Sequence, residues 1–423
     1  MKKAFLCSVV LVCSSAAAFA QSGTNSPYSQ YGLGILSDQS QGFNRGMNGL
    51  AIGLRYGNQV NVLNPASYSA VDSLTMIFDV GLSGQITNFK EGNVRRNAKN
   101  ADLEYAVAAF RAFPKIGLSV GIVPFTNIGY SYSNTTRIGT STTTSTELHS
   151  GSGGIHQAFV GLGWNVWGGL SVGANLSYLW GSYDRSISVS SSDGYVNTVS
   201  KAYSATVSSY KIDLGLQWQH KLDADNVMTL GATLGIGHKL GADPSVTTTT
   251  SNSQTGVSAD TTSVVSNGLA IPMSYGVGVS WCHADKFTVG VDYFLQQWGK
   301  LDFPETDSRS GHYVMQGGLL KNRHKVTVGG EWIPDPMSLN FLKRVRYRFG
   351  VAYATPYINI NGQDGPKEYS VSGGFGIPVS RSFLNISAQW VRSDSKAFIV
   401  ENTFRVNIGL TFNERWFMKW KVE

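Results

Sequence analysis

The fold is decided by the segment GFNRGMNGLAIGL at residues 42–54 and by the tripeptide Asn64-Pro65-Ala66 that follows it. The segment has too many glycines for a stable helix and lacks the alternation of a strand, yet apolar residues such as Phe43 and Met47 are spread through it. Such a stretch keeps one conformation only where surrounding structure satisfies its backbone polar groups. We therefore expect residues 21–72 to form an extended arm and a plug that the rest of the chain encloses.

The N-terminus has the pattern of a secretory signal peptide. It begins MKK, continues with an apolar run at residues 4–12 and ends with the small-residue cleavage site Ala18-Phe19-Ala20. The sequence therefore predicts a cleaved signal at residues 1–20 and export from the cytoplasm. Cys13 admits a lipoprotein as the alternative, although Val12 stands directly before it where a small residue is wanted.

The composition of the exported chain restricts it to two classes. Charged residues make up only 14% of the sequence, well below the roughly 25% of soluble domains, while 48 of the 423 residues are glycine. Beyond the signal, no apolar run approaches the roughly 18 residues of a membrane-spanning helix. Cleavage takes away two lysines and lowers the formal net charge from +7 to +5, which does not favour a nucleic-acid partner, and it leaves Cys282 as the single cysteine. These features leave a secreted β-sandwich or an outer-membrane β-barrel.

Alternating apolar and polar residues predict strands throughout residues 73–412. In the segment FTVGVDY at residues 287–293 every odd position is large and apolar and every even one is small or polar, and residues 347–353, 384–390 and 404–412 repeat the pattern. This arrangement suits a strand with lipid outside and a polar interior. A sandwich strand also alternates, with its apolar face turned inward, so the alternation alone does not separate the two classes.

The connections between the predicted strands do separate them. They alternate between short turns, such as residues 113–114 and 283–285, and long loops, such as residues 134–152 and 241–267. An up-and-down membrane barrel has turns at one end and loops at the other, whereas a Greek-key sandwich has no reason to segregate them. The sequence therefore predicts an all-β fold, a transmembrane antiparallel β-barrel of about 14 strands at residues 73–412 with the N-terminal plug in its lumen.

Aromatic residues near the ends of the predicted strands indicate a girdle at the membrane–water interface. The tryptophans concerned are Trp164, Trp167, Trp180, Trp281, Trp298, Trp332 and Trp390. After the last strand, the tail at residues 413–423 mixes aromatic and basic residues, so we expect it to lie at the periplasmic interface or to meet a periplasmic partner.

The region before the first strand resembles a known family. Small turns that contain Gly and Arg, followed by Asn64-Pro65-Ala66 and then by the first strand of a barrel, resemble the FadL-like outer-membrane transport proteins of Gram-negative bacteria. The motif match covers about residues 31–79, and the topology match covers the mature chain. The resemblance implies a hatch inside the barrel and transport of hydrophobic compounds such as long-chain fatty acids.

In that family the Asn-Pro-Ala segment lies beside an inward kink of the third strand, through which substrate leaves the barrel sideways. The resemblance therefore implies a gate on the plug, to which we assign Asn64, Pro65, Ala66, Phe43 and Met47.

The predicted third strand contains Pro124 and Phe125. A proline cannot donate a hydrogen bond to the strand ladder, which is an independent reason to expect a break where the family has its kink. The alternative is that Pro124 only ends the membrane-spanning part of this strand.

The residues with reactive side chains do not predict an enzyme. The histidines are scattered without metal-ligand spacing. Cys282-His283-Ala284-Asp285 places a thiol, an imidazole and a carboxylate close together, but on a short turn rather than in a pocket. Asp260-Thr261-Thr262 and Asp72-Ser73-Leu74 fit a loose O-glycosylation pattern, which leaves glycosylation of the chain open. We expect no catalytic residue, no metal and no cofactor.

Two functions remain after these exclusions. The first, which is the function that the sequence and the resemblance predict, is passive transport of a hydrophobic or amphipathic small molecule across the outer membrane, with lateral release through a wall opening that the plug gates. The second is a non-transporting FadL-like barrel that acts as a partner in an outer-membrane assembly or protein-secretion complex, which the long outer loops and the tail favour. The expected partners are outer-membrane lipids and either a hydrophobic ligand or other outer-membrane proteins. A continuous apolar cavity in the lumen would favour transport, and a filled lumen would favour the second function.

Overall fold

The structure is a computed structural model that describes residues 23–415 apart from residues 141, 253, 308–310 and 397. The predicted signal peptide at residues 1–20 lies outside the described residues, as does most of the predicted tail, residues 416–423.

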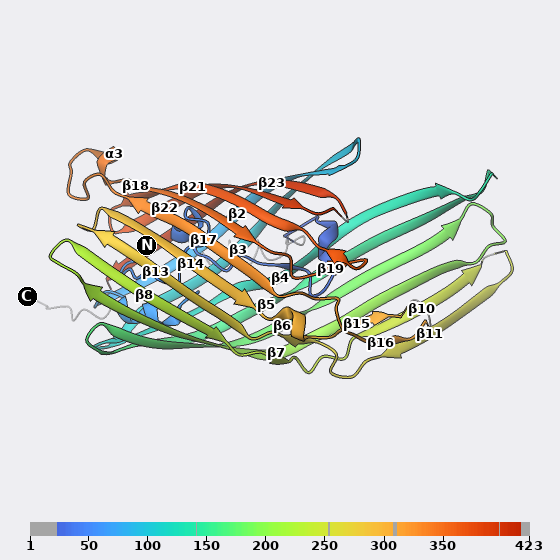
Figure 1. The fold of residues 1–423 in the computed structure, drawn as a ribbon, viewed down its shortest axis with the longest axis horizontal. Coiled ribbons are helices and arrows are strands. Elements are labelled where there is room, and N and C mark those ends of the chain that lie inside the picture. The colour runs from blue at the N-terminus through green and yellow to red at the C-terminus, as the bar shows by residue number, and fades with distance from the viewer. Residues whose placement is uncertain (1–22, 141, 253, 308–310, 397, 416–423) are drawn as a thin grey trace, which may run out of the picture.

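A single antiparallel sheet closes on itself and forms a barrel (Figure 1). In the described part of the chain its wall has 14 strands, and the first of them pairs with the last. The strands are β2 (Thr75–Glu91), β3 (Val94–Phe113), β4 (Ile116–Arg137), β5 (Thr144–Trp167), β6 (Leu170–Ser191), β7 (Thr198–Lys221), β8 (Asn226–Gly235), β13 (Ser274–His283), β14 (Phe287–Gln296), β17 (Arg323–Trp332), β18 (Arg346–Ala354), β21 (Lys367–Val379), β22 (Ser382–Asp394) and β23 (Val400–Arg415). The predicted all-β fold, an antiparallel barrel of about 14 strands, is confirmed.

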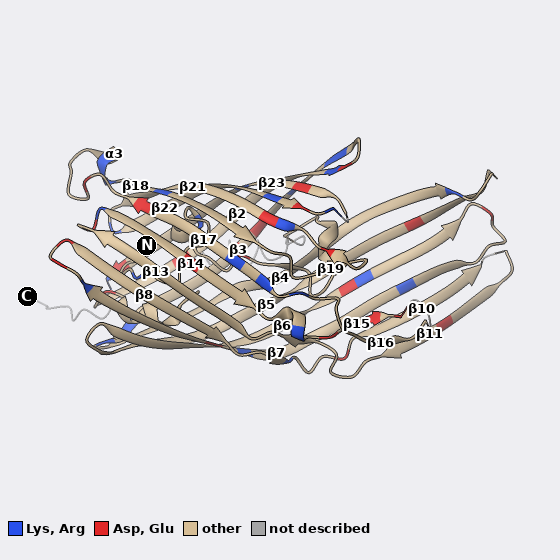
Figure 2. Ribbon diagram, in the orientation of Figure 1, with Lys and Arg blue, Asp and Glu red and all other residues tan. Residues whose placement is uncertain are grey.

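The wall has its apolar side chains outside and its polar side chains inside. In β14, Val291 and Tyr293 are exposed, whereas Thr288 and Asp292, on the opposite face of the strand, are buried. The same alternation places Ile408 and Leu410 of β23 outside. Figure 2 shows few charged residues along the wall strands. This inverted pattern is that of a barrel surrounded by lipid, with a polar interior.

Four wall strands project far beyond the others at one end of the barrel. β4, β5, β6 and β7 have 22 to 24 residues each, whereas β8, β13 and β14 have 10. The hairpin of β10 (Ser245–Asn252) and β11 (Val257–Val264) extends this projecting sheet by pairing with the outer half of β7. Much of what the sequence suggested as outer loops is therefore strand. Threonine is common in strands, so Ser- and Thr-rich segments can form a sheet while they remain exposed to water.

Shorter elements complete the described chain. The small strands are β1 (Ile35–Leu36), which pairs with β4, and the pairs β9 (His238–Lys239) with β12 (Ala270–Ile271), β15 (Phe303–Thr306) with β16 (Tyr313–Gln316), and β19 (Asn359–Ile360) with β20 (Gln363–Asp364). The helical turns are η1 (Pro27–Gln30), α2 (Gly42–Arg45), η2 (Pro65–Ala70), η3 (Trp298–Lys300) and α3 (Phe341–Arg344). Within the described residues no helix is long and apolar enough to span a membrane.

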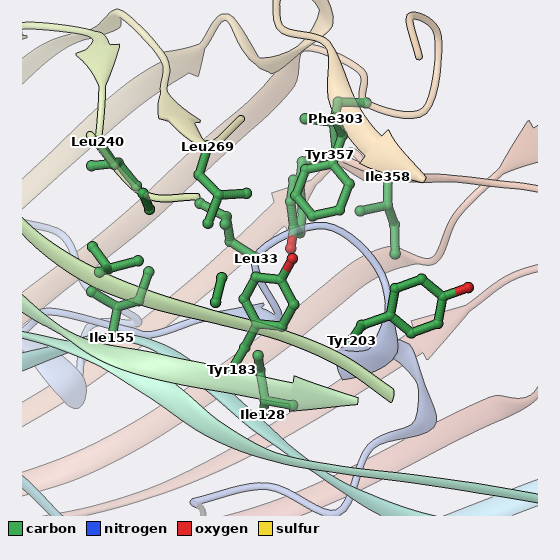
Figure 3. Close-up of a cluster of buried hydrophobic side chains, with 14 of the residues drawn as sticks. Leu33, Ile128, Ile155, Tyr183, Tyr203, Leu240, Leu269, Phe303, Tyr357 and Ile358 are labelled. Atoms are coloured by element: carbon green, nitrogen blue, oxygen red, sulfur yellow. The ribbon is translucent and has the colours of Figure 1, made fainter. Parts of the chain in front are cut away.

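The largest buried apolar cluster lies at the outer end, where the N-terminal arm, the projecting strands and the outer loops meet. Leu33 of the arm lies between wall residues such as Tyr183 and loop residues such as Leu269 and Tyr357 (Figure 3). Trp298 belongs to this cluster and is fully buried, so its assignment to the interfacial girdle was wrong. The sequence placed it by its position at a strand end, but the outer loops fold over that end.

Candidate functional site

Residues 40–72, which we call the luminal segment, contact strands all round the barrel. The α2 turn packs against β2, β21, β22 and β23, while η2 packs against β3 to β7. Between these two contacts, Asp292 of β14 accepts hydrogen bonds from the backbone N–H groups of Ala51 and Ile52, at 2.6 and 2.8 Å. A segment that reaches so many wall strands lies inside the lumen, where Figure 1 shows the blue part of the chain.

Glycines in the wall allow the luminal segment to approach the strands closely. A Cβ atom on Gly163 of β5 would lie 2.6 Å from the carbonyl oxygen of Pro65 and 2.8 Å from the backbone nitrogen of Ser69. Further round the wall, a Cβ atom on Gly329 of β17 would lie 3.0 Å from Cβ of Met47. Side chains at these wall positions would require the segment or the wall to move, so the high glycine content here serves packing.

The tripeptide Asn64-Pro65-Ala66 begins the η2 turn and fixes it to the wall. Asn64 is the N-cap, since its Oδ1 accepts a hydrogen bond from the N–H of Ala66, and Pro65 occupies the first turn, where no N–H donor is needed. The Asn64 side-chain amide also donates to the carbonyl oxygens of Ile52, at 2.8 Å, and of Leu216 in β7, at 3.2 Å. The three residue types thus cap, start and pack a buried turn.

Phe43 and Met47 lie in a separate group. Their side chains are fully buried and form an apolar cluster with Leu50 and Leu54, against which Tyr56 packs. Met47 faces β17 and β18 through the glycines of those strands, whereas η2 faces β3 to β7. The structure therefore distributes the gate residues named from the sequence over two contact regions of the luminal segment.

Arg45 ties the luminal segment to the wall by charge. Its guanidinium donates to Glu104 Oε2 of β3 at 3.0 Å and to Asn407 Oδ1 of β23 at 2.9 Å, and it donates to the carbonyl oxygens of Asp38 and Ser40 at 3.0 Å each. Arg45 is only 3% exposed. Arg45 was not among the site residues assigned from the sequence. An arginine in an apolar, glycine-rich segment is nevertheless a signal of a buried ion pair, because a charge is rarely buried without a partner.

The wall between β3 and β4 is separated over its outer half. These two strands pair only from Phe113 and Ile116 outward to Ala106 and Ile122, beyond which β3 pairs with β2 alone. A register irregularity in β4 lies between Pro124 and Thr126. β4 itself runs without interruption from Ile116 to Arg137, so Pro124 coincides with a register shift against β5 rather than with a break, and this shift lies close to where β3 and β4 part.

Residues 23–39, which we call the arm, line this separation. Ile35 and Leu36 form β1, which pairs with Asn127 and Thr126 of β4. The N–H of Ser37 donates to the carbonyl oxygen of Phe125 at 3.0 Å, and the Gln39 amide donates to that of Pro124 at 3.3 Å. The resemblance implied that Asn64-Pro65-Ala66 would neighbour the kink, but the residues that hydrogen-bond to it belong to the arm.

Two of the cavities that the described residues enclose in the lumen lie beside the arm. The first has a volume of about 170 Å³, and its lining includes the charged residues Asp38, Asp102, Glu104, Glu401, Lys325 and Arg405. The second, of about 160 Å³, has a mixed lining that includes Phe125, Phe294, Asp213 and Lys211. A cavity of about 150 Å³ can hold benzene when its walls are apolar. The charged lining, rather than the volume, makes the first cavity a poor site for a hydrocarbon.

A third hollow, of about 420 Å³, lies among the outer loops. Its lining combines the apolar residues Leu269, Ile271, Met273, Leu301 and Met315 with charged residues. No signal in the sequence predicts an apolar hollow here, because its lining comes from both ends of the connection between β8 and β13 and from the connection between β14 and β17.

Arg185 in the outer half of β6 holds the arm and the outer loops together. Its guanidinium donates to the carbonyl oxygen of Gln30 at 2.6 Å and lies 4.9 Å from the ring centre of Tyr203 and 5.9 Å from that of Phe303 in β15. Burial alone would lower the pKa of Arg185, but Tyr183 and Glu305 act against burial, and the net effect raises the pKa above its ordinary value. The side chain therefore remains charged at any physiological pH.

The reactive residues weighed in the sequence stay on the turn where they were expected. Cys282 and His283 end β13, and the Cys282 sulfur lies 3.9 Å from Oδ1 of Asp285. His283 Nδ1 contacts the Asn226 side chain instead of the thiol. Among the described residues, no group of three or more His, Cys, Asp or Glu side chains could hold a metal ion.

These features define a class: an outer-membrane-type β-barrel with residues 40–72 packed against the inner side of its wall. The family model BamG matches residues 1–423, and the chain belongs to that family. No curated protein matches the chain.

Solved structures similar to this chain include transporters and channels. The toluene transporter TbuX of Ralstonia pickettii superposes with a TM-score of 0.60 at 16% sequence identity, over 88% of this chain and 97% of that one. The Pseudomonas putida toluene transporter TodX gives a TM-score of 0.59 at 14% identity, over 89% and 98%. A Pseudomonas aeruginosa FadL homologue gives 0.56 at 13% identity, over 88% and 97%. At these identities the likeness establishes the fold alone.

Proposed function

We propose that this chain is a non-transporting barrel subunit that acts as a partner in an outer-membrane assembly or protein-secretion complex. In this proposal the luminal segment is a fixed plug. The observation that carries the proposal is the close fit of the luminal segment. The segment contacts wall strands all round the lumen, and its backbone approaches wall glycines such as Gly163 so closely that a Cβ atom there would overlap it. A gate has to move, and close packing of this kind resists movement.

The polar interactions of the segment support the same function. Arg45 and Glu104 form a buried ion pair, and Asn48 donates to Ser370 Oγ at 2.7 Å and accepts from the Gln389 amide at 2.6 Å. Moving the segment while the lumen stays closed to water would separate this ion pair and leave Glu104 buried without its partner, which costs about 3–5 kcal/mol. A fixed plug makes the barrel a rigid support for other proteins.

Native mass spectrometry of the protein, extracted gently from its own outer membrane, tests the proposal. We expect a stoichiometric complex with other outer-membrane proteins and no bound hydrophobic ligand. A lone barrel that carries a fatty acid or a similar compound would contradict the proposal.

A cross-linking experiment tests whether the plug is fixed. The variant combines Asn48→Cys, Ser370→Cys and Cys282→Ser, so that a short bifunctional thiol reagent joins the luminal segment to β21. Because these two side chains are already in contact, we expect complex formation to be the same before and after cross-linking. The matched controls carry one of the two new cysteines each. Loss of the complex only in the cross-linked double variant would contradict a fixed plug.

Passive transport of hydrophobic molecules is the second candidate function. The outer-loop hollow and the separation of β3 from β4 at Pro124 favour it, as do neighbours described as toluene transporters. In this mechanism a ligand would enter at the loops and leave sideways where the arm lines the wall. The same cross-linked variant distinguishes transport from the complex-subunit function. If the plug gates the route, locking it should abolish uptake of a fluorescent fatty acid.

A further inference from the structure

The inner turn between β17 and β18 differs from the other inner turns in length and in character. Residues 334–344, which we call the inner loop, carry Met337 and Leu339 at 90% and 101% exposure, and Leu342 at 63%. Its two ends are anchored, since Ile333 and Val345 are buried. The loop is thus fixed at its base and presents large apolar side chains at its tip.

Hydrogen bonds within the inner loop give it a defined shape. The N–H of Asp335 donates to the carbonyl oxygen of Lys343 at 2.9 Å, and the Asn340 side chain caps the α3 turn by accepting from the N–H of Leu342 at 3.0 Å. The exposed apolar side chains therefore belong to an ordered turn. Exposing several large apolar groups to water is unfavourable, so a surface that covers them is expected.

The inner loop continues directly from the lipid-facing surface of the barrel. Trp332 precedes it and is 52% exposed on the outside of β17, where its ring lies 5.7 Å from that of Tyr347 in β18. The Tyr347 hydroxyl donates to the carbonyl oxygen of Leu342 at 3.1 Å, which joins the loop to this aromatic pair. Exposed aromatic residues at strand ends mark the level of the lipid headgroups. Figure 1 shows α3 beyond the strand ends at that side of the barrel.

The charges of the inner loop agree with a headgroup environment. Lys343 and Arg344 are exposed and stand next to Phe341 and Leu342, while Asp335 is the one acidic residue of the loop. Apolar side chains combined with basic ones are typical of segments that lie in a membrane interface. Because the barrel already spans the bilayer, the loop reaches the lipid surface without the entropic cost of association.

We propose that the inner loop is a lipid-binding element that lies in the headgroup region of the periplasmic leaflet and prefers anionic phospholipids. Met337, Leu339 and Leu342 enter the boundary of the acyl chains, and Lys343 and Arg344 contact lipid phosphates. The site is independent of the lumen and of either function considered above.

Site-directed fluorescence in vesicles tests this proposal. In a Cys282→Ser background, Leu339→Cys is labelled with an environment-sensitive fluorophore, and the matched control carries the label at Ala224→Cys in the inner turn between β7 and β8. With vesicles that contain phosphatidylglycerol, we expect lipids carrying a nitroxide in the headgroup region to quench the label at position 339, and iodide in the water to quench the label at position 224. Equal iodide quenching at both positions would overturn the proposal.

Charge substitutions test the lipid preference. A basic side chain near an anionic surface contributes about 1 kcal/mol, or about a fivefold change in partitioning. The variant Lys343→Gln/Arg344→Gln should therefore lower lipid quenching at position 339 in anionic vesicles and leave it unchanged in phosphatidylcholine vesicles. An equal loss in both lipids would overturn the anionic preference. A label shielded from both quenchers in native outer membranes would overturn lipid binding in favour of a protein partner.

Discussion

An alanine at Gly163 should destabilise the barrel, because the luminal segment leaves no room for a methyl group there. The new Cβ atom would lie 2.6 Å from the Pro65 carbonyl oxygen, 2.8 Å from the Ser69 nitrogen and 2.9 Å from the Tyr68 Cβ, whereas ordinary contacts begin at 3.4 Å. The η2 turn or β5 must then shift by about 0.8 Å, and overpacking of this kind costs about 1–3 kcal/mol. Since β5 is paired on both sides, we expect η2 to move.

The matched control is Gly84→Ala in β2. A Cβ atom at this position meets nothing within 4 Å, and the residue lies on the exposed face of the strand. Both variants change the entropy of the unfolded chain equally, which by itself stabilises the folded protein by about 0.4–1 kcal/mol. The difference between the two variants therefore isolates the contact with the luminal segment.

Guanidinium titration of the protein in lipid vesicles, followed by tryptophan fluorescence, measures the free energy of unfolding. We expect Gly163→Ala to be less stable than the wild type by about 1–3 kcal/mol, and Gly84→Ala to be at least as stable as the wild type. Equal stability of the two variants would mean that the luminal segment yields easily, and the argument for a fixed plug would then fail.

Two further substitutions test the charged contacts. Arg45→Met should lower the free energy of unfolding in the same titration by about 3–5 kcal/mol, because it leaves Glu104 buried without its partner. Adding Glu104→Gln should recover part of this loss. No recovery would refute the ion pair as the cause. Arg185→Met should release the β15–β16 hairpin from β6 and so speed proteolytic cleavage of that hairpin. The barrel itself should stay intact on a native gel. An unchanged cleavage rate would show that other contacts hold the hairpin.

Much of the barrel could be predicted from the sequence because a membrane strand has a strong local signature. Strands such as β14 and β23 alternate without interruption, and the inner turn between β13 and β14 is short enough to predict a hairpin. The outer end was harder to foresee. Strands that leave the membrane lose the lipid-facing signal, so the outer halves of β5 and β6 resemble hydrated loops in composition.

The candidate site could be predicted only in part. Asn64-Pro65-Ala66 and Pro124 are local signals, a capped turn and a missing donor, and the structure has a turn at the first and a strand irregularity at the second. The contacts of Arg45 and Arg185 join residues that are far apart in the chain, and a single sequence carries no information on such pairs.

The length of the projecting strands sets how far this protein reaches from the cell. β5 has 24 residues, which at about 3.3 Å per residue gives a ribbon about 80 Å long. With the usual tilt of about 45°, it rises about 55 Å along the membrane normal, of which the apolar band of a barrel accounts for about 25 Å. Roughly 30 Å of sheet therefore stands outside the apolar band of the membrane. Large particles that approach the cell surface meet the Ser- and Thr-rich hairpin of β10 and β11 before they meet the membrane.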